Sequence, residues 1–129
     1  IRWKGRERTC SCKINGCMAS PIDLYKRYLL ERENTHLYAE DDCFITYEFC
    51  DGYVYIVDMY VVPEKRNAGT CRRISEVVEA IAKERGYSNV VGTVCTSTNN
   101  WEQSLAVIKR GGYNEYERQG DMIYLVKKI

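Results

Sequence analysis

Residues 54–86 read VYIVDMYVVPEKRNAGTCRRISEVVEAIAKERG, and the hydrophobic period changes within this stretch. The first nine residues are rich in β-branched and aromatic side chains, which predicts a buried strand. From about Thr70 the apolar residues recur at helical spacing, so we expect an amphipathic helix that ends at Gly86. A strand that leads directly into a helix is typical of a βαβ unit. The polar loop between them, residues 63–73, either only interrupts regular structure or binds an anion.

The predicted helix has one apolar and one polar face. Its apolar stripe consists of Ile74, Val77, Val78, Ile81 and Ala82. We expect four charged side chains to face water: Glu76, Glu79, Lys83 and Glu84.

The segments around this unit predict a mixed sheet. Ser20 and Pro21 have the residue types of a helix start, and Asp51-Gly52 is a strong hairpin signal. The expected helices cover residues 20–33, 70–86 and 99–110, the last starting at Asn99 or Asn100. The expected strands cover residues 36–40, 43–50, 53–62, 89–95, 113–118 and 122–127. We expect strand 89–95 to run parallel to strand 53–62 and the other neighbours to pair antiparallel. The fold class is therefore α/β or α+β.

Length and charge restrict the class of protein. A chain of 129 residues is expected to form one domain, residues 1–129, with a single core. No apolar run approaches the roughly 18–20 residues that cross a bilayer, so we expect no membrane partner. The 19 basic and 18 acidic residues give a net charge of +1, which does not favour nucleic acid as a partner. The N-terminal segment lacks the apolar region of a secretory signal, which favours a cytoplasmic protein.

Three of the seven cysteines, Cys10, Cys12 and Cys17, stand close together as CxCx4C, which raises the question of a metal site. Zinc sites need paired ligands, and the only histidine, His36, lies nineteen residues beyond Cys17 without a second pair near it. We expect no metal and interpret the cysteines as reduced thiols.

The loop has the composition of an anion site. A helix that follows a strand begins with free N–H groups and the positive end of its dipole. Residues 67–71 are small enough for close approach of a ligand to the backbone, and Arg66, Arg72 and Arg73 can offset negative charge. The loop matches neither the P-loop nor the GxGxxG pattern of dinucleotide folds.

Residues 66–71, RNAGTC, resemble the pyrophosphate loop of the GNAT superfamily of N-acetyltransferases, with Arg66 and Gly69 in place and a departure at Cys71. The strand exit at Val62-Pro63, the asparagines Asn99-Asn100 and residues 109–113, KRGGY, are also similar to features of that family. The resemblance extends over residues 53–113. It implies a GNAT-like, mostly antiparallel sheet in which a central parallel strand pair splays apart.

The resemblance implies acetyl-CoA, or another acyl-CoA, as cosubstrate. Its pyrophosphate would lie on the N–H groups of the loop, and its pantetheine arm would run along the strand edge, opposite residues 93–96. Asn100 would be a side-chain partner of the arm, with Asn99 as the alternative. The implied cofactor-binding residues are Met59, Tyr60, Val61, Arg66, Asn67, Ala68, Gly69, Thr70, Cys71, Arg72 and Asn100.

Acyl transfer to an amine needs a base, because an amine such as that of lysine has an unperturbed pKa near 10.4. Asp58 is the first candidate for this base and Glu48 the second. The carbonyl oxygen needs a fixed N–H donor, for which Tyr60 or Met59 is the candidate. The resemblance thus implies N-acetylation of a primary amine on a small molecule or peptide, and it leaves a homodimer open.

The tyrosine that many members of the family use as general acid is absent. Its position falls on Ile108, or on Val107 with a one-residue slip. Tyr113 is the first substitute, and Tyr116 and Tyr124 are alternatives nearby. A thiol has a pKa of about 8.5 and can leave largely unassisted. A protein that keeps the CoA site without catalysis is the alternative function.

Overall fold

The computed structural model describes residues 20–129, which a boundary after Leu37 divides into two compact units. Cys10, Cys12 and Cys17 lie outside the described residues, so their expected lack of a metal stays a prediction. None of the described helices combines the length and apolar character that a membrane crossing requires.

The first unit contains α1 (Pro21–Glu33), and its start follows the predicted capping pattern. The Ser20 hydroxyl accepts a hydrogen bond from the Asp23 N–H at 3.2 Å, and the Asp23 carboxylate accepts one from the Ser20 N–H. These bonds form a capping box, which satisfies N–H groups that the helix itself leaves unpaired. Asn34 ends the helix in the left-handed conformation.

The sheet has six strands in the order β1-β2-β3-β4-β6-β5. Their bounds are β1 (His36–Ala39), β2 (Cys43–Phe49), β3 (Val54–Val61), β4 (Asn89–Cys95), β5 (Asn114–Gln119) and β6 (Met122–Lys128). The central pair β3 and β4 is parallel, whereas β2–β3, β4–β6 and β5–β6 are antiparallel. This arrangement confirms the predicted mixed sheet with its parallel pair.

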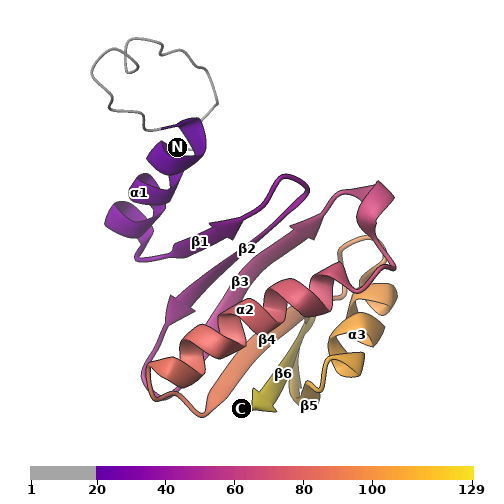
Figure 1. Cartoon of the computed structure of the whole chain (residues 1–129). Coiled ribbons are helices and arrows are strands. Elements are labelled where there is room, and N and C mark those ends of the chain that lie inside the picture. Colours follow the sequence, from indigo (N-terminus) through magenta and orange to yellow (C-terminus); the bar gives the residue numbers. More distant parts are fainter. Residues whose placement is uncertain (1–19) are drawn as a thin grey trace, which may run out of the picture. The chain divides into compact units, whose positions relative to one another are not determined.

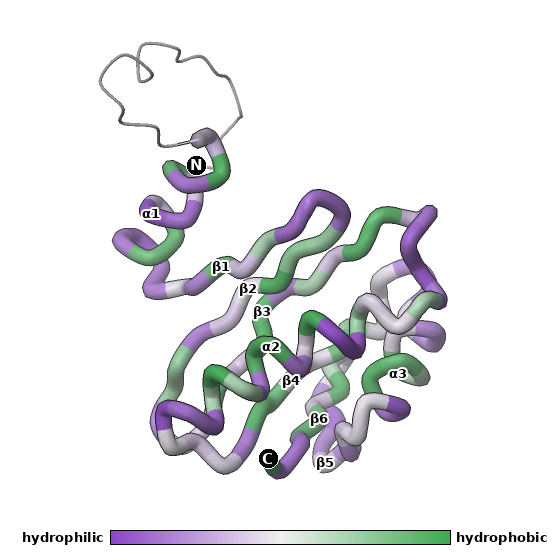
Figure 2. Tube along the Cα trace, in the orientation of Figure 1, coloured by the Kyte–Doolittle hydropathy of each residue, from purple (hydrophilic) through white to green (hydrophobic). Residues whose placement is uncertain are grey.

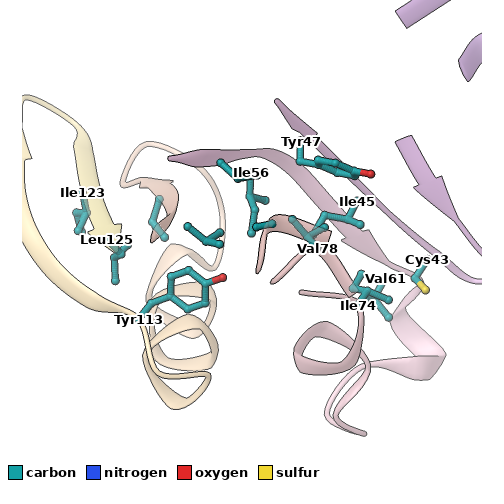
Figure 3. Close-up of a cluster of buried hydrophobic side chains, with 14 residues drawn as sticks. Cys43, Ile45, Tyr47, Ile56, Val61, Ile74, Val78, Tyr113, Ile123 and Leu125 are labelled. Carbon is teal, nitrogen blue, oxygen red and sulfur yellow. The ribbon is translucent and has the colours of Figure 1, made fainter. Parts of the chain in front are cut away.

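Helices α2 (Thr70–Glu84) and α3 (Trp101–Arg110) lie on the same face of this sheet (Figure 1). They cover a core that takes alternate residues of the strands together with one face of α2, and Figure 3 shows its central side chains. Its fully buried members are Ile45, Val54, Ile74, Val78, Ala82, Val90 and Leu125. Within residues 38–129, no helix covers the other face of the sheet, which we call the open face.

The expectation that Glu79 faces water is wrong. Its side chain is only 11% exposed. Its carboxylate accepts hydrogen bonds from the Tyr113 hydroxyl at 2.8 Å and from the Lys127 Nζ at 2.9 Å. Helical spacing placed Glu79 beside the apolar stripe, and two partners distant in sequence make its burial tolerable.

Candidate functional site

The parallel strands β3 and β4 separate soon after they meet. Only two residue pairs, Val54–Val90 and Tyr55–Val91, are in register, and the strands then diverge toward their carboxyl ends. Just past the last pair, the Tyr55 hydroxyl and the Thr93 Oγ1 hydrogen-bond across the divide at 3.1 Å. Beyond this bond lies the splay that the resemblance implied, with β3 on one side and β4 on the other.

A bulge in β3 sets the direction of its N–H groups. The pairing with β2 skips Val57, and the Asp58 N–H donates to the Thr46 hydroxyl at 3.0 Å. The Val62 N–H donates toward the same side, to the Asp42 carbonyl. Because direction alternates along a strand, the Met59 N–H points the other way, into the splay. Of the two predicted donors for a carbonyl oxygen, Met59 therefore has the suitable direction and Tyr60 does not.

The loop between β3 and α2 presents a row of free donors. Among the described hydrogen bonds, the N–H groups of residues 65, 66 and 73 find backbone acceptors, whereas those of residues 67–72 find none. Asn67 and Gly69 hold φ angles of +61° and +82°, and no side chain caps α2. Figure 2 shows this connection as a hydrophilic segment beyond the apolar end of β3. Consecutive N–H groups at a helix start form a suitable cradle for a phosphate.

Arg66 lies at the junction of loop and splay. Its Nε donates to the Val61 carbonyl at 2.8 Å, and its guanidinium stands 5.4 Å from the centre of the Tyr60 ring. Arg66 thus fixes the loop to the end of β3 through its Nε, and the described hydrogen bonds use none of its other donors. Tyr60 is 45% exposed.

The remaining arginines of the loop differ in availability. Arg73 forms a bidentate ion pair with Glu40, at 2.7 and 2.8 Å. This pair connects the first turn of α2 to the turn between β1 and β2. Arg72 is exposed and has only a distant contact with Glu76, 3.7 Å away. Arg72 is therefore the freer of the two for a ligand.

Cys71 packs against the core, and burial raises the pKa of its thiol. A nucleophilic cysteine needs the opposite shift, so Cys71 serves as a small side chain beneath the loop. Ala68 and Thr70 complete this segment, and the Thr70 hydroxyl donates to the Lys65 carbonyl.

Asn100 lies on the β4 side of the site, directly before α3. It is exposed and holds φ +60°, and no side chain caps the helix there. Asn34, Asn67 and Asn100 are the residues other than glycine with positive φ in the described chain, and two of them are predicted cofactor partners. Backbone in this conformation is often retained at binding sites.

The candidate bases lie together on the open face. Asp58 pairs with Thr46 in the ladder, and Glu48 lies two residues further along β2, opposite Tyr55. Asp58 is exposed and Glu48 is half-buried. Both therefore share the face that carries Tyr55 and Thr93, beside the splay.

Tyr113 lies on the opposite face. It is 4% exposed, and Figure 3 shows its ring among the core side chains. Burial, together with the adjacent Glu79 carboxylate, raises the pKa of its hydroxyl far above the usual range. This environment opposes proton donation at the splay. Ile108 also packs against the core, so the position of the missing tyrosine is filled by an apolar side chain.

Tyr124 is better placed than Tyr113 for the role of acid. It pairs with Thr93 across β4 and β6, and its ring lies 6.2 Å from that of Tyr116. Sequence reasoning placed Thr93 at the site but missed Tyr55 and Thr46. The only sequence signal for them is the two-residue period that puts alternate side chains of a strand on one face. In β3 the bulge at Val57 interrupts this period.

One group of described residues has the types that bind metals. Glu40, Asp42 and Cys43 bring a ligand atom each within 4.8 Å of one another. The Glu40 carboxylate already accepts hydrogen bonds from Arg73 and Tyr38. In this structure the Glu40 carboxylate therefore binds Arg73 and Tyr38.

No family model and no curated protein matches the chain, but solved structures do. One is the PaiA N-acetyltransferase from Thermoplasma acidophilum in complex with coenzyme A: 15% identity, TM-score 0.68, covering 85% of this chain and 72% of that one. Another is a GNAT family acetyltransferase from Elizabethkingia anophelis with acetyl-CoA bound: 16% identity, TM-score 0.63, covering 83% and 85%. A third is the IAA acetyltransferase from Bacillus cereus: 14% identity, TM-score 0.63, covering 83% and 87%. The fold of this chain is that of the GNAT N-acetyltransferases.

Proposed function

We propose that the protein is an N-acetyltransferase that moves an acetyl group from acetyl-CoA to a primary amine. The observation that carries the proposal is the junction of two features: six free N–H groups at the start of α2, and a splay between β3 and β4 that begins beside them. The first suits a pyrophosphate and the second suits an extended arm. Two of the similar structures contain coenzyme A or acetyl-CoA, which supports the same cosubstrate here.

The residues of the chain fit this cosubstrate in three places. Residues 67–72 would receive the pyrophosphate, with Arg66 and Arg72 as cationic partners. The N–H groups of Met59 and Val61, which both point into the splay, would pair with the amides of the arm. Asn100 would approach the arm from the β4 side. No described backbone bond occupies these strand donors beyond Tyr55.

When bound, acetyl-CoA supplies an activated acyl carbon and a thiolate leaving group. The Met59 N–H would donate to the carbonyl oxygen, where negative charge develops as the amine attacks. Asp58, directly or through a water, would accept the proton that the amine nitrogen loses. Tyr124 could donate a proton toward the departing sulfur. Positioning is the larger contribution, since the thiolate leaves readily.

Ligand-dependent thermal stability tests cofactor binding. Millimolar coenzyme A or acetyl-CoA should raise the Tm, because a ligand at 100 times its Kd stabilises the folded state by about 2.7 kcal/mol. Unchanged melting at millimolar ligand would refute the proposal.

The role of Asp58 is tested by Asp58→Asn. The acetylation rate at neutral pH should fall by about 10²–10⁴-fold, the range for loss of a general base, while the coenzyme A shift stays intact. Glu48→Gln in parallel identifies the base if Asp58→Asn leaves the rate unchanged.

A CoA-binding module without catalysis is the second candidate function. Ile108 in the core and the buried hydroxyl of Tyr113 favour it, because the expected acid position holds no tyrosine and the first substitute is buried away from the splay. A coenzyme A shift combined with no release of free thiol from acetyl-CoA, across a broad panel of amines, would support this function instead.

A further inference from the structure

The open face carries a row of tyrosines that begins at the splay. The Tyr55 hydroxyl bonds Thr93, Thr93 pairs with Tyr124, and Tyr124 pairs with Glu117 on the edge strand β5. Tyr116, 53% exposed, packs its ring beside that of Tyr124. The row therefore extends from the proposed reaction centre across four strands to the edge of the sheet.

Tyr53 joins the same group. Its pKa is raised, first by the neighbouring Cys50 and also by Tyr116 and Tyr55. Tyr53 is 38% exposed, so the group presents ring surface to solvent. Aromatic faces that remain open to solvent bind ammonium groups and the methylene chains that carry them.

Charge on this face is mainly negative. Asp58 and Glu117 are exposed at the two ends of the row. Two cations of the neighbouring strands face the helices instead: Lys127, which bonds Glu79 of α2, and Arg118, which pairs with the buried Ile123 and bonds Glu115. Lys128 shares the open face. It pairs with Asn89 at the start of β4, four residues along β6 from Tyr124.

The two ends of the site thus carry opposite charge. Arg66 and Arg72 stand at the two ends of the loop segment where the anionic cosubstrate is proposed to bind. The carboxylates of Asp58 and Glu117 flank the tyrosine row on the open face. A neutral or anionic acceptor would gain nothing from this arrangement, whereas a cationic one would be attracted along the row.

We propose that the acceptor is an amine that carries a second positive charge. The reacting nitrogen would lie beside Asp58 at the splay, and the second ammonium group would lie over the tyrosines near Glu117. The inference rests on the proposed acetyltransferase function and adds the chemical class of its acceptor.

Two amines of equal length test it: hexamethylenediamine, and n-heptylamine, which has a methyl group in place of the second ammonium. The rate of thiol release from acetyl-CoA gives kcat/KM for each. We expect about a tenfold preference for the diamine, the effect of one favourable contact of an ammonium group with aromatic faces and a carboxylate. Higher salt should reduce the preference, because both ends of the row are exposed.

Variants locate the second charge. Glu117→Gln and Tyr116→Leu should each raise KM for the diamine and bring the two kcat/KM values closer together. Glu84→Gln, an exposed change on the last turn of α2, is the matched control and should keep the wild-type ratio.

Equal kcat/KM values for the two amines would overturn the inference alone, since acetyl transfer would then proceed without a second charge. A diamine preference that both variants leave unchanged would overturn the assignment to the tyrosine row. Transfer to neither amine would overturn the inference, and the coenzyme A shift would then tell whether the cosubstrate proposal fails with it.

Discussion

Helices α1 and α2 begin in opposite ways. α1 starts at a capping box in which Ser20 and Asp23 satisfy each other's N–H groups. α2 starts at Gly69, where no side chain caps the helix and the N–H groups of residues 67–72 stay free. Capping contributes about 1 kcal/mol to a helix. The chain therefore uses this stabilisation at α1 and forgoes it at α2, which is the expected pattern where a ligand takes the place of the cap.

The start of α2 is held by a different device. Arg73, in its first turn, forms the bidentate ion pair with Glu40, and Arg66 bonds the Val61 carbonyl. Both contacts leave the N–H groups of the loop exposed. A side-chain cap both holds the start of a helix and accepts hydrogen bonds from its free N–H groups. At α2 the two arginine contacts hold the helix start, and the N–H groups remain free.

The largest expected effect comes from Gly69→Val. A β-branched residue at φ +82° costs about 1–2 kcal/mol of stability and displaces the loop, so the coenzyme A shift in Tm should disappear. Gly86→Val is the matched control, since Gly86 has φ +89° and equally open surroundings at the other end of α2. Both variants should lose similar stability without ligand. An equal loss of the ligand shift in both would remove the distinction between the two helix starts.

Asn67→Asp adds a carboxylate to the cradle with little strain, because Asp tolerates the φ of +61° found there. The negative charge should stabilise the free protein by about 0.3–1 kcal/mol, as at other helix starts. The same charge should repel a pyrophosphate and reduce the coenzyme A shift. Thermal melts with and without ligand measure both effects. A larger shift in the variant would contradict an anion site.

Ser20→Ala removes the cap of α1. It should lower the free energy of unfolding by about 1 kcal/mol in a urea titration that follows helix content. Coenzyme A should stabilise the variant as much as the original protein. A lost ligand shift would mean that the two helix starts are not independent.

The Glu40–Arg73 contact predicts a pH dependence. Arg73, and next Tyr38, lower the pKa of Glu40 from 4.5 to about 2. A carboxyl with a depressed pKa contributes stability that is complete above its unfolded pKa and lost as pH falls through its folded pKa. The Tm should therefore fall between about pH 4.5 and pH 2, and Glu40→Gln should fall less over that interval. Parallel profiles for both proteins would show that Glu40 makes no such contribution.

The sequence predicted the elements and their order because hydrophobic period and turn residues are local properties. Residues 54–86 alone specify strand, loop and helix, and Asp51-Gly52 specifies the hairpin before them. The candidate site followed only in part. Loop residues could be identified from their position between two elements, whereas Tyr113 and Glu79 meet across 34 positions of sequence. Nothing local to either residue signals that contact.

The choice between Met59 and Tyr60 shows the same limit. It depends on the bulge at Val57, which reverses the alternation of the strand. A bulge arises from the pairing of two strands, and the residues of β3 by themselves read as a regular strand.

The bulge also decides which change in the length of β3 the chain can accept during evolution. Because Val57 adds one residue to β3, Val54 and Ile56 before it and Val61 after it all reach the core. If all eight residues of β3 paired with β2 without the bulge, Asp58 and Tyr60 would turn inward, and the Met59 N–H would point toward β2 instead of into the splay. A deletion of Val57 itself would remove the bulge and leave the other side chains of β3 on their present faces. The chain can therefore lose Val57 without exchanging the two faces of β3, but while Val57 is present these faces depend on the bulge.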